Sequence, residues 1–285
     1  MKFFVPILAI FCISCSNLNS KETKKSESVI DSSSNLSIKY NHHSTEVSYE
    51  PSVKDTTRYV YLTIDDGPSP FSRDILEISN TESTKMTVFL VGNNMWSKKY
   101  QQYLAEYRNS ALIDLGNHSY SHAKGRYSHY YHDPNAVLLD FYKNIAEMQL
   151  PNSLARLPGR SFWSLGNKEN INQESGRKAA RLLKEKGFLL FGWDVEWFYD
   201  HNTGAPLGTA EKVFHEIQFS LRNNLTFEKS HCVVLLHERH FVQKREVSKL
   251  IELCKKAGFK FEHLKNYPVS KSPELTRREI MPKSS

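Results

Sequence analysis

The chain has 285 residues, of which 39% are hydrophobic and 24% are charged, and its formal net charge is +7. This composition is typical of a globular protein with a sizeable core, and it excludes collagen-like and wholly disordered chains. The positive residues are interspersed with Asp and Glu rather than clustered in a stripe, and no nucleic-acid-binding motif is present. We therefore expect no nucleic-acid partner.

The first residues have the pattern of an export signal. Met1-Lys2 is a minimal basic region, and an almost unbroken apolar run at residues 3–13 follows it. The run is too short to span a bilayer as a mature helix, so residues 1–15 are predicted to be a cleaved signal peptide. Cys12-Ile-Ser-Cys15 resembles the lipobox of bacterial lipoproteins, which implies a lipid on Cys15. The alternative is a chance cysteine beside an ordinary cleavage site.

The remainder is expected to hold one folded domain between two polar segments. Residues 16–54 are rich in Ser, Asn, Lys and Glu, with too few bulky apolar residues to offset the entropy of ordering, which predicts a disordered tether. Residues 55–268 are enough for one domain with its own core. Residues 269–285 are expected to be a polar tail. With the lipid on Cys15, the exported protein would be anchored to a bacterial membrane in the cell envelope.

Short apolar runs alternate with amphipathic stretches along the domain. The apolar runs predict strands at 59–64, 86–91, 111–115, 188–191, 232–236 and 259–261. The amphipathic stretches predict helices at 71–78, 98–108, 134–148, 175–186, 209–223 and 242–256. This alternation, with near-continuous apolar strands, predicts an α/β fold whose parallel sheet is rolled into a barrel. Catalytic residues of such folds collect at the C-terminal ends of the strands.

Three polar motifs lie at or beside such strand ends. Thr63-Ile-Asp-Asp-Gly-Pro-Ser69 supplies two adjacent carboxylates, and Asn117-His-Ser-Tyr-Ser-His122 supplies two imidazoles at i and i+4. A further imidazole, His237, closes the apolar run Val233-Val-Leu-Leu. Taken alone, the first motif is as easily a turn, because Asp, Gly and Pro are turn formers. Together the three motifs supply what a hydrolytic divalent-metal site needs.

The spacing of these side chains favours a catalytic metal. Asp65 and Asp66 can point in different directions because side chains alternate along an extended segment. His118 and His122 reach one point in space if their segment is helical. One Asp and two His with open positions suit a catalytic zinc ion rather than a closed structural site.

Cys232 and Cys254 are the cysteines outside the signal region. An oxidising compartment permits a bridge between them. Two buried free thiols are the favoured alternative.

The motifs resemble those of the polysaccharide deacetylase family, carbohydrate esterase family 4, whose catalytic unit is the NodB-homology domain. Its five motifs occur in the family's order from Tyr59 to about His263. The resemblance implies a distorted (β/α) barrel with parallel strands and outer helices. It also implies an N-deacetylase that needs one divalent metal ion, with Zn²⁺ favoured and Co²⁺ or another ion as the alternative.

The resemblance implies a role for each residue of the three motifs. Asp65 matches the family's catalytic base. Asp66, His118 and His122 match its metal ligands. His237, in the Leu-x-His motif, matches the general acid, which would deliver a proton to the departing amine.

A fourth motif, Arg156-Leu-Pro158, matches the family's Arg-x-Pro, whose arginine orients the base. The backbone N–H of Gly159 would then help to hold the oxyanion. The family usually has an aromatic residue at this position, so Arg160 and Trp163 are expected to take over part of the substrate contact. Taken alone, Arg156 is as well explained by a surface ion pair.

The remaining motif also departs from the family pattern, which ends in Asp-Trp. This chain reads Trp193-Asp-Val-Glu-Trp197. Either Asp194 or Glu196 could support His237, and Asp194 is favoured because it would form a short, rigid bond. Trp197 is expected to line the cleft, although at least one of the two tryptophans is expected to be a core residue.

The expected substrate is an N-acetylated polysaccharide. The family acts on peptidoglycan, chitin, chitooligosaccharides and some exopolysaccharides, and an envelope lipoprotein would meet peptidoglycan first. The alternatives are an exopolysaccharide or chitooligosaccharide deacetylase, a hydrolase of a non-sugar amide, and a non-catalytic glycan-binding lipoprotein. No protein partner is implied, and a monomer is expected.

Overall fold

The computed structural model describes residues 57–268. The predicted signal peptide with Cys15, the tether at 16–54 and the tail at 269–285 lie outside these residues and stay predictions. Within the described residues, no helix has the length and hydropathy that crossing a membrane requires.

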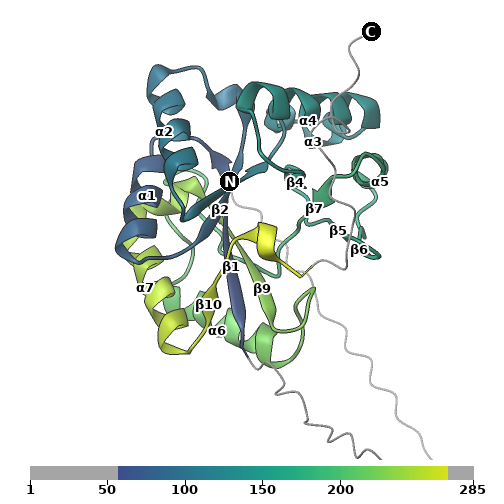
Figure 1. Ribbon diagram of the computed structural model, residues 1–285. Helices are drawn as coiled ribbons and strands as arrows, with labels where there is room; N and C mark the ends of the chain where they lie inside the picture. The colour runs from purple at the N-terminus through teal and green to yellow at the C-terminus, as the bar shows by residue number, and fades with distance from the viewer. Residues whose placement is uncertain (1–56, 269–285) are drawn as a thin grey trace, which may run out of the picture. The chain divides into compact units, whose positions relative to one another are not determined.

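A curled, mostly parallel sheet forms the centre of the domain (Figure 1). Its strands are β1 (Tyr59–Gly67), β2 (Met86–Leu90), β3 (Ile113–Asn117), β4 (Leu154–Ala155), β5 (Trp163–Leu165), β6 (Lys168–Asn170), β7 (Leu189–Leu190), β8 (Val195–Glu196), β9 (His231–His237) and β10 (Lys260–Phe261). Their order is β6-β5-β7-β4-β3-β2-β1-β9-β8, with β10 paired to β1. Only β5 pairs antiparallel, with β6 and β7, among the named strands. The sheet curls as a half-barrel, which confirms the predicted fold class.

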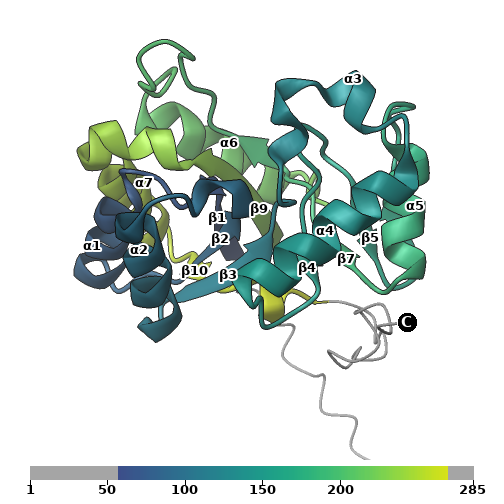
Figure 2. The ribbon, with the colours of Figure 1, turned by 90° about the horizontal axis from the view of Figure 1, so that it is seen from above.

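Seven helices of the described chain surround the sheet (Figure 2). They are α1 (Ser72–Thr81), α2 (Lys98–Asn109), α3 (Tyr127–Tyr130), α4 (Pro134–Met148), α5 (Arg177–Glu185), α6 (Ala210–Arg222) and α7 (Lys244–Lys256). The start of α4 shows why the sequence is informative. The Asp133 carboxylate accepts hydrogen bonds from the N–H groups of Asn135 and Ala136, and Pro134 occupies the first helical position.

Some short elements were not expected from the sequence. Strands β4, β5, β6 and β8 have only two or three residues each, and α3 has four, so none carries a periodic signal. The strand expected at 111–115 is found at Ile113–Asn117. This shift places the end of β3 directly before His118.

Both faces of the sheet are buried, which explains the near-continuous apolar strands. Along β1, Val60, Leu62 and Ile64 belong to a core cluster shared with the helices. Tyr61, between them, belongs to a second cluster, with aromatic side chains from other strands such as Phe89 and Trp163. The two clusters lie on opposite faces of the sheet, because successive side chains alternate along a strand.

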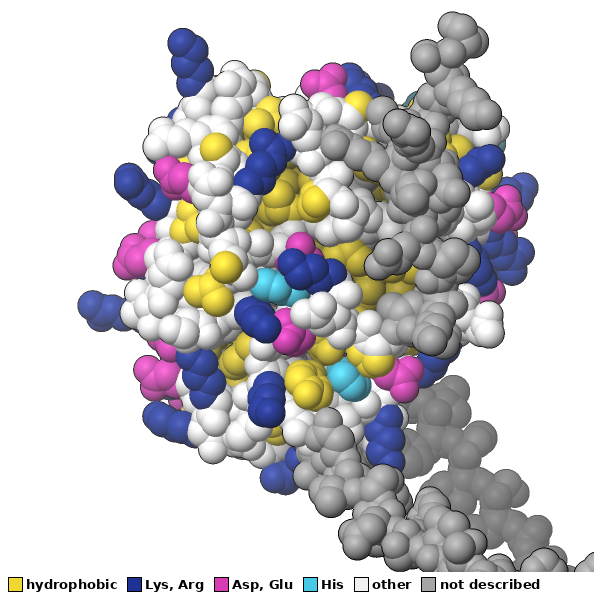
Figure 3. Space-filling view, in the orientation of Figure 1, with side chains coloured by type: hydrophobic (Ala, Val, Ile, Leu, Met, Phe, Trp, Pro, Cys, Tyr) yellow, Lys and Arg dark blue, Asp and Glu magenta, His cyan; other side chains and the backbone are white. Residues whose placement is uncertain are grey.

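Cys232 and Cys254 are both buried free thiols. The favoured prediction for the cysteines is therefore confirmed, and burial raises the pKa of both thiols. On the face seen in Figure 3, Lys and Arg side chains are scattered among acidic and apolar ones. Charged side chains therefore form no single patch on that face.

Candidate active site

The end of β1 points its two carboxylates in different directions. The pairing of β1 with β2 shifts register between Ile64 and Gly67, and Asp66 has a φ of 74°. The Asp65 side chain is consequently buried, with 2% of the residue exposed, whereas Asp66 is half-buried. The amide of Asn94 donates a hydrogen bond to the Asp66 carbonyl oxygen at 2.8 Å, which holds this unusual backbone conformation. The predicted divergence of the two carboxylates is thus observed, through a bulge rather than a regular strand.

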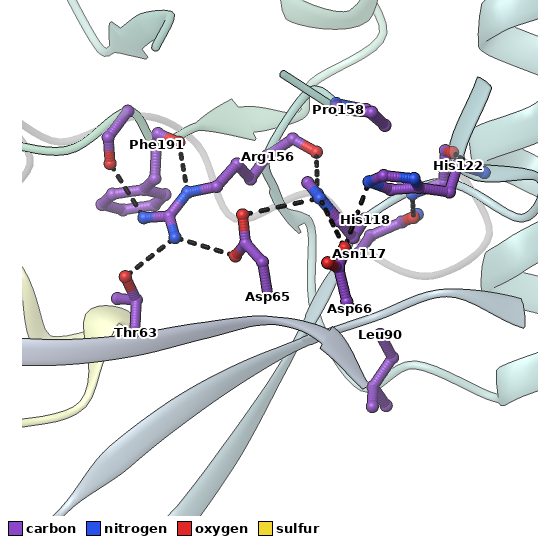
Figure 4. Close-up of polar contacts among 12 residues, drawn as sticks. Thr63, Asp65, Asp66, Leu90, Asn117, His118, His122, Arg156, Pro158 and Phe191 are labelled. Atoms are coloured by element: carbon purple, nitrogen blue, oxygen red, sulfur yellow. Dashed lines mark hydrogen bonds and ion pairs between the residues drawn. The ribbon is translucent and has the colours of Figure 1, made fainter. Parts of the chain in front are cut away.

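Asp66, His118 and His122 form a compact group, with one ligand atom of each residue lying within 4.8 Å of those of the others. Figure 4 shows the two imidazoles converging on Asp66. The segment between the two histidines is not helical. Ser119 and His122 have φ values of 64° and 50°, so the chain turns sharply instead.

Side-chain hydrogen bonds stabilise this turn. Asn117 accepts a hydrogen bond from the Ser119 N–H at 2.9 Å, and the Ser119 hydroxyl accepts one from the His122 N–H at 3.0 Å. Asn144 of α4 donates to the same Asn117 oxygen at 2.7 Å. The turn therefore presents both histidines to Asp66 although no helix sets their spacing.

The group fits a divalent cation. Nδ1 of His118 lies 2.9 Å from the carbonyl oxygen of Arg156, to which it can donate, and this leaves Nε2 free as a ligand. Oδ1 of Asp66 is buried without a hydrogen-bond partner, 3.1 Å from Nε2 of His122 and 3.7 Å from Nε2 of His118. A cation would pair this oxygen, and the mixed oxygen and nitrogen donors suit zinc.

The pKa values of Asp66 and His118 agree with that fit, whereas the pKa of His122 is raised, because the neighbouring Asp66 carboxylate outweighs the effect of burial. Burial raises the pKa of Asp66, but the adjacent His122 ring, with the charges of His237 and His118, outweighs burial and holds the pKa well below its usual range. Burial lowers the pKa of His118, although the nearby charge of Asp65 opposes the effect. Asp66 as a carboxylate and His118 as a neutral imidazole are the forms that bind metals.

Asp65 is held by a buried arginine. Arg156 is fully buried, and its Nη1 donates to Oδ1 of Asp65 at 2.9 Å and to the Thr63 hydroxyl at 2.8 Å. Its Nε and Nη2 donate to the carbonyl oxygens of Phe191 and Gly192. A surface ion pair is therefore excluded for Arg156. The guanidinium fixes one carboxylate oxygen of Asp65 and leaves Oδ2 turned toward His118, 3.5 Å from its Nε2.

His237 reaches the same end of the barrel from the neighbouring strand. In the parallel pairing of β1 and β9, Asp65 and His237 are register partners. The ring of Tyr199 lies 4.8 Å from the His237 ring, and Nδ1 of His240 accepts a hydrogen bond from the His237 backbone N–H at 3.0 Å. These contacts fix the backbone and one face of the imidazole.

The favoured prediction, that Asp194 supports His237, is wrong. Its two carboxylate oxygens accept hydrogen bonds from the backbone N–H groups of Phe227 and Val233, at 2.7 and 2.8 Å. Burial raises the pKa of Asp194 to about 6, and these two hydrogen bonds oppose the rise. The carboxylate thus anchors the start of β9, far along that strand from His237.

Glu196 lies closer than Asp194 to the end of β9 that carries His237. It is the register partner of Leu235, two positions before His237. Burial raises the pKa of Glu196, and the charge of His237 is the largest influence that lowers it. Glu196 rather than Asp194 therefore remains the candidate for electrostatic support of His237, although no hydrogen bond joins their side chains within the described residues.

Gly159 has a φ of 64°, which favours glycine, and a Cβ atom there would lie 3.2 Å from the Tyr127 ring. The Tyr127 ring lies 6.1 Å from that of His122, so α3 supplies an aromatic wall beside Gly159. Arg160 is tied to Ser175 by two hydrogen bonds and stands over the Tyr131 ring. Gly159 and Arg160 therefore lie at the rim of the site, and their roles stay predictions.

The two tryptophans predicted as substrate contacts are packed inside the domain. Trp197 is 1% exposed and belongs to the main core, so the prediction that it lines the cleft is wrong. Trp163 is 3% exposed and stacks on Phe227 with ring centroids 4.4 Å apart. It supports the sheet and offers almost no surface to a substrate. Trp193 is instead the half-buried tryptophan, with its ring 5.7 Å from the Arg156 guanidinium.

Sequence reasoning missed the aromatic and imidazole groups that surround the centre, namely Tyr127, Trp193, Tyr199 and His240. The only signal for His240 was its position three residues after His237. Tyr127 and Tyr199 lie in segments without periodicity, and only the folded chain brings them to the site.

Comparison with known proteins agrees with this geometry. A sequence model of the family described as polysaccharide deacetylase matches residues 52–148. The matched stretch includes Asp65, Asp66 and the two histidines of the metal group. Over this stretch the chain is similar to the polysaccharide deacetylase family. The match ends before Arg156 and His237, whose assignment therefore depends on the contacts described above.

Two curated relatives are similar over most of the chain. A peptidoglycan-N-acetylglucosamine deacetylase of Bacillus cereus is 24% identical over 216 residues, which cover 72% of this chain and 68% of the relative. A chitin disaccharide deacetylase of Vibrio alginolyticus is also 24% identical, over 75% of this chain and 72% of the relative.

Solved structures share the fold. A CE4 esterase of Streptococcus mutans has a TM-score of 0.58 at 19% identity, covering 73% of this chain and 86% of that one. The catalytic domain of a peptidoglycan N-acetylglucosamine deacetylase from Eubacterium rectale has a TM-score of 0.57 at 22% identity, covering 79% and 96%. At such identities these structures establish the fold of this chain and leave its substrate open.

Proposed function

We propose that the protein is a metal-dependent hydrolase that removes N-acetyl groups from a cell-envelope polysaccharide, with peptidoglycan as the first candidate. The observation that carries the proposal is the placement of Asp65 and His237 as register partners beside the Asp66, His118 and His122 group. A base, an acid and three metal ligands thus meet at one end of the half-barrel.

Asp66, His118 and His122 would hold one divalent ion, with zinc favoured by the donor set. Such an ion, when bound, polarises a carbonyl group and makes a water molecule more acidic. The remaining chemistry belongs to side chains of this chain.

Asp65 would accept the proton of the attacking water through Oδ2, because Arg156 already occupies Oδ1. His237 would donate a proton to the sugar nitrogen as the C–N bond breaks, which releases acetate and a free amine. The backbone N–H of Gly159 would donate to the oxygen that gains negative charge during the attack. The buried Asp65–Arg156 pair needs no reorganisation for this step, since four hydrogen bonds fix the guanidinium.

Peptidoglycan is favoured for two reasons. The Bacillus cereus relative is named a deacetylase of peptidoglycan N-acetylglucosamine. The predicted lipid anchor on Cys15 and the tether at 16–54 would keep the domain close to the cell wall. Chitooligosaccharide remains the second candidate, because the Vibrio alginolyticus relative acts on a chitin disaccharide.

Release of acetate tests the proposal. The purified protein, supplemented with zinc, would be incubated with peptidoglycan, poly-N-acetylglucosamine and chitooligosaccharides, with Asp65→Asn as the inactive control. We expect acetate from at least one polymer and the largest rate with peptidoglycan. Binding of these glycans without release of acetate would instead support the non-catalytic alternative, and a non-sugar amide substrate would leave all three glycans untouched.

A further inference from the structure

Exposed apolar side chains gather around one hollow beside β8. Phe198, Phe219 and Leu225 are 59%, 61% and 62% exposed. All three line a hollow of about 900 Å³ formed by β8, α6 and the segments that follow them. Contiguous exposed apolar surface usually marks a binding site, and ligand pockets typically measure roughly 300–1,000 Å³. We call this feature the β8 hollow.

The β8 hollow combines apolar and polar groups. Lys212, His215, Glu216 and Ser220 of α6 lie in the same lining as the aromatic side chains. A wholly apolar occupant would leave these polar groups without partners, which costs binding energy. A sugar ring has an apolar face of C–H groups and an edge of hydroxyl groups, so it matches both kinds of lining.

The β8 hollow adjoins the catalytic centre. Trp193 and Glu196 belong to its lining. The Trp193 ring lies 5.7 Å from the Arg156 guanidinium, and Glu196 is the register partner of Leu235, two residues before His237. Trp193 and Glu196 therefore lie between the hollow and the proposed catalytic groups.

A second hollow continues the first. It measures about 620 Å³ and shares Trp193 and Leu225 with the β8 hollow. Side-chain amides of Asn170, Asn172 and Gln173 contribute to its lining, and such groups commonly bind hydroxyl groups. Together the two hollows extend the site beyond the size of one sugar.

We propose that the β8 hollow binds sugar units of the substrate chain next to the unit that loses its acetyl group, with Phe198 and Phe219 as stacking surfaces. This inference depends on the proposed function, because the chain must enter the hollow from the catalytic centre. If the inference holds, Phe198 and Phe219, which lie outside the catalytic motifs, make the enzyme favour a polymer over a short substrate.

The test compares substrates of two lengths. Acetate release from N-acetylglucosamine disaccharide and hexasaccharide would be measured for the zinc-loaded wild type and for the Phe198→Ala/Phe219→Ala variant. Leu139→Ala on α4 is the matched control, because Leu139 is 61% exposed and lies outside both hollows. We expect kcat/KM for the hexasaccharide to fall about tenfold, equivalent to ~1.4 kcal/mol of binding, with the disaccharide changed less than twofold.

A second measurement separates this inference from the proposed function. Calorimetric binding of the hexasaccharide to Asp65→Asn, with and without the two alanine substitutions, does not depend on turnover. Weaker binding in the triple variant supports the hollow even if the wild type releases no acetate. An equal loss for both lengths, or unchanged hexasaccharide binding, overturns the inference, and the second result would point to a protein partner for the hollow.

Discussion

Asp65 and His237 are register partners at the ends of two adjacent parallel strands, β1 and β9. This one relationship places a carboxylate and an imidazole, 172 positions apart in the sequence, at the same edge of the sheet. Arg156 contacts only the first of the two, through a hydrogen bond of 2.9 Å to Oδ1. The two groups are therefore suited to opposite tasks, one accepting a proton and the other donating it.

The His237→Ala variant should lose activity without losing the fold. General acid catalysis is typically worth roughly 10²–10⁴-fold, so we expect kcat to fall by about that factor. His237 is half-buried at the end of β9, so the thermal midpoint and zinc content should stay close to those of the wild type. Acetate release across pH measures the effect. If the wild-type rate falls at high pH and the residual rate of this variant falls in the same way, a group other than His237 is the general acid.

Asp65→Asn should show a similar loss of kcat together with a loss of stability. The substitution removes the charge that faces the fully buried Arg156 guanidinium. Breaking a buried pair from one side is destabilising, although the three other acceptors of Arg156 limit the effect. A thermal midpoint below that of His237→Ala is the expected result.

Metal content should depend on His122 and not on a neighbouring surface histidine. We expect His122→Ala to lower the zinc bound per molecule by at least about tenfold, because one of three protein ligands is lost. His129→Ala is the control, since that side chain is exposed and outside the group. Zinc measured after dialysis decides the matter. Wild-type zinc content in His122→Ala, and equally in Asp66→Ala, would show that the ion binds elsewhere.

The sequence predicted the fold and the metal group well because both have local signals. The apolar runs of β1, β2 and β9 are long enough to be recognised as strands. Asp65 and Asp66 lie at the end of β1, and His118 directly follows β3. The mode by which His118 and His122 converge could not be predicted. It depends on positive φ values at Ser119 and His122, which Asn117 and Asn144 stabilise from other elements.

The choice between Asp194 and Glu196 needed the structure for a different reason. In the sequence the two carboxylates are equivalent neighbours of Val195. The pairing of β8 with β9 turns Asp194 toward the backbone of Val233, at the start of β9, and brings Glu196 two residues nearer to His237. A shift of two positions in that pairing would instead have placed Asp194 opposite Leu235.

Replacement of the buried Arg156 should lower the stability of the domain. Arg156→Met leaves the Asp65 carboxylate buried without its partner, and we expect the free energy of unfolding to fall by about 3–5 kcal/mol. Arg160→Met is the control, because Arg160 lies at the rim and should cost under about 1 kcal/mol. Urea denaturation compares the two. Equal losses would mean that Arg156 does not stabilise a buried charge.

The lipid anchor stays a prediction outside the described residues, and it can be tested in cells. Cys15→Ala should move the protein from the membrane fraction to the soluble fraction, because the acceptor of the lipid is lost. Ser20→Ala, in the predicted tether, should leave the protein in the membrane fraction. Mass spectrometry of the mature N-terminus checks the modification, and an unmodified Cys15 in a membrane-retained protein would exclude the anchor.

The residue after His237 offers a pH-dependent test of the packing around the site. Glu238 is fully buried, and it accepts hydrogen bonds from the Ser72 and Tyr107 hydroxyls. Burial raises the pKa of Glu238 from its ordinary 4.5 to about 7, although hydrogen bonds from Ser69, Ser72 and Tyr107 oppose the rise. A Cβ atom on Gly67 would lie 2.5 Å from its Oε1, so the carboxyl group packs directly under the end of β1.

Because the folded state binds this proton more tightly than the unfolded state, Glu238 stabilises the fold below about pH 4.5, and that contribution is lost as the pH rises through about 7. Glu238→Gln imitates the protonated form at every pH. Its free energy of unfolding relative to the wild type should therefore rise by roughly 3 kcal/mol between pH 5 and pH 8. Glu252→Gln, at an exposed position of α7, should keep the wild-type pH dependence. Urea denaturation at several pH values measures both variants, and a difference between Glu238→Gln and the wild type that stays constant with pH would mean that Glu238 is ionised throughout in the folded protein.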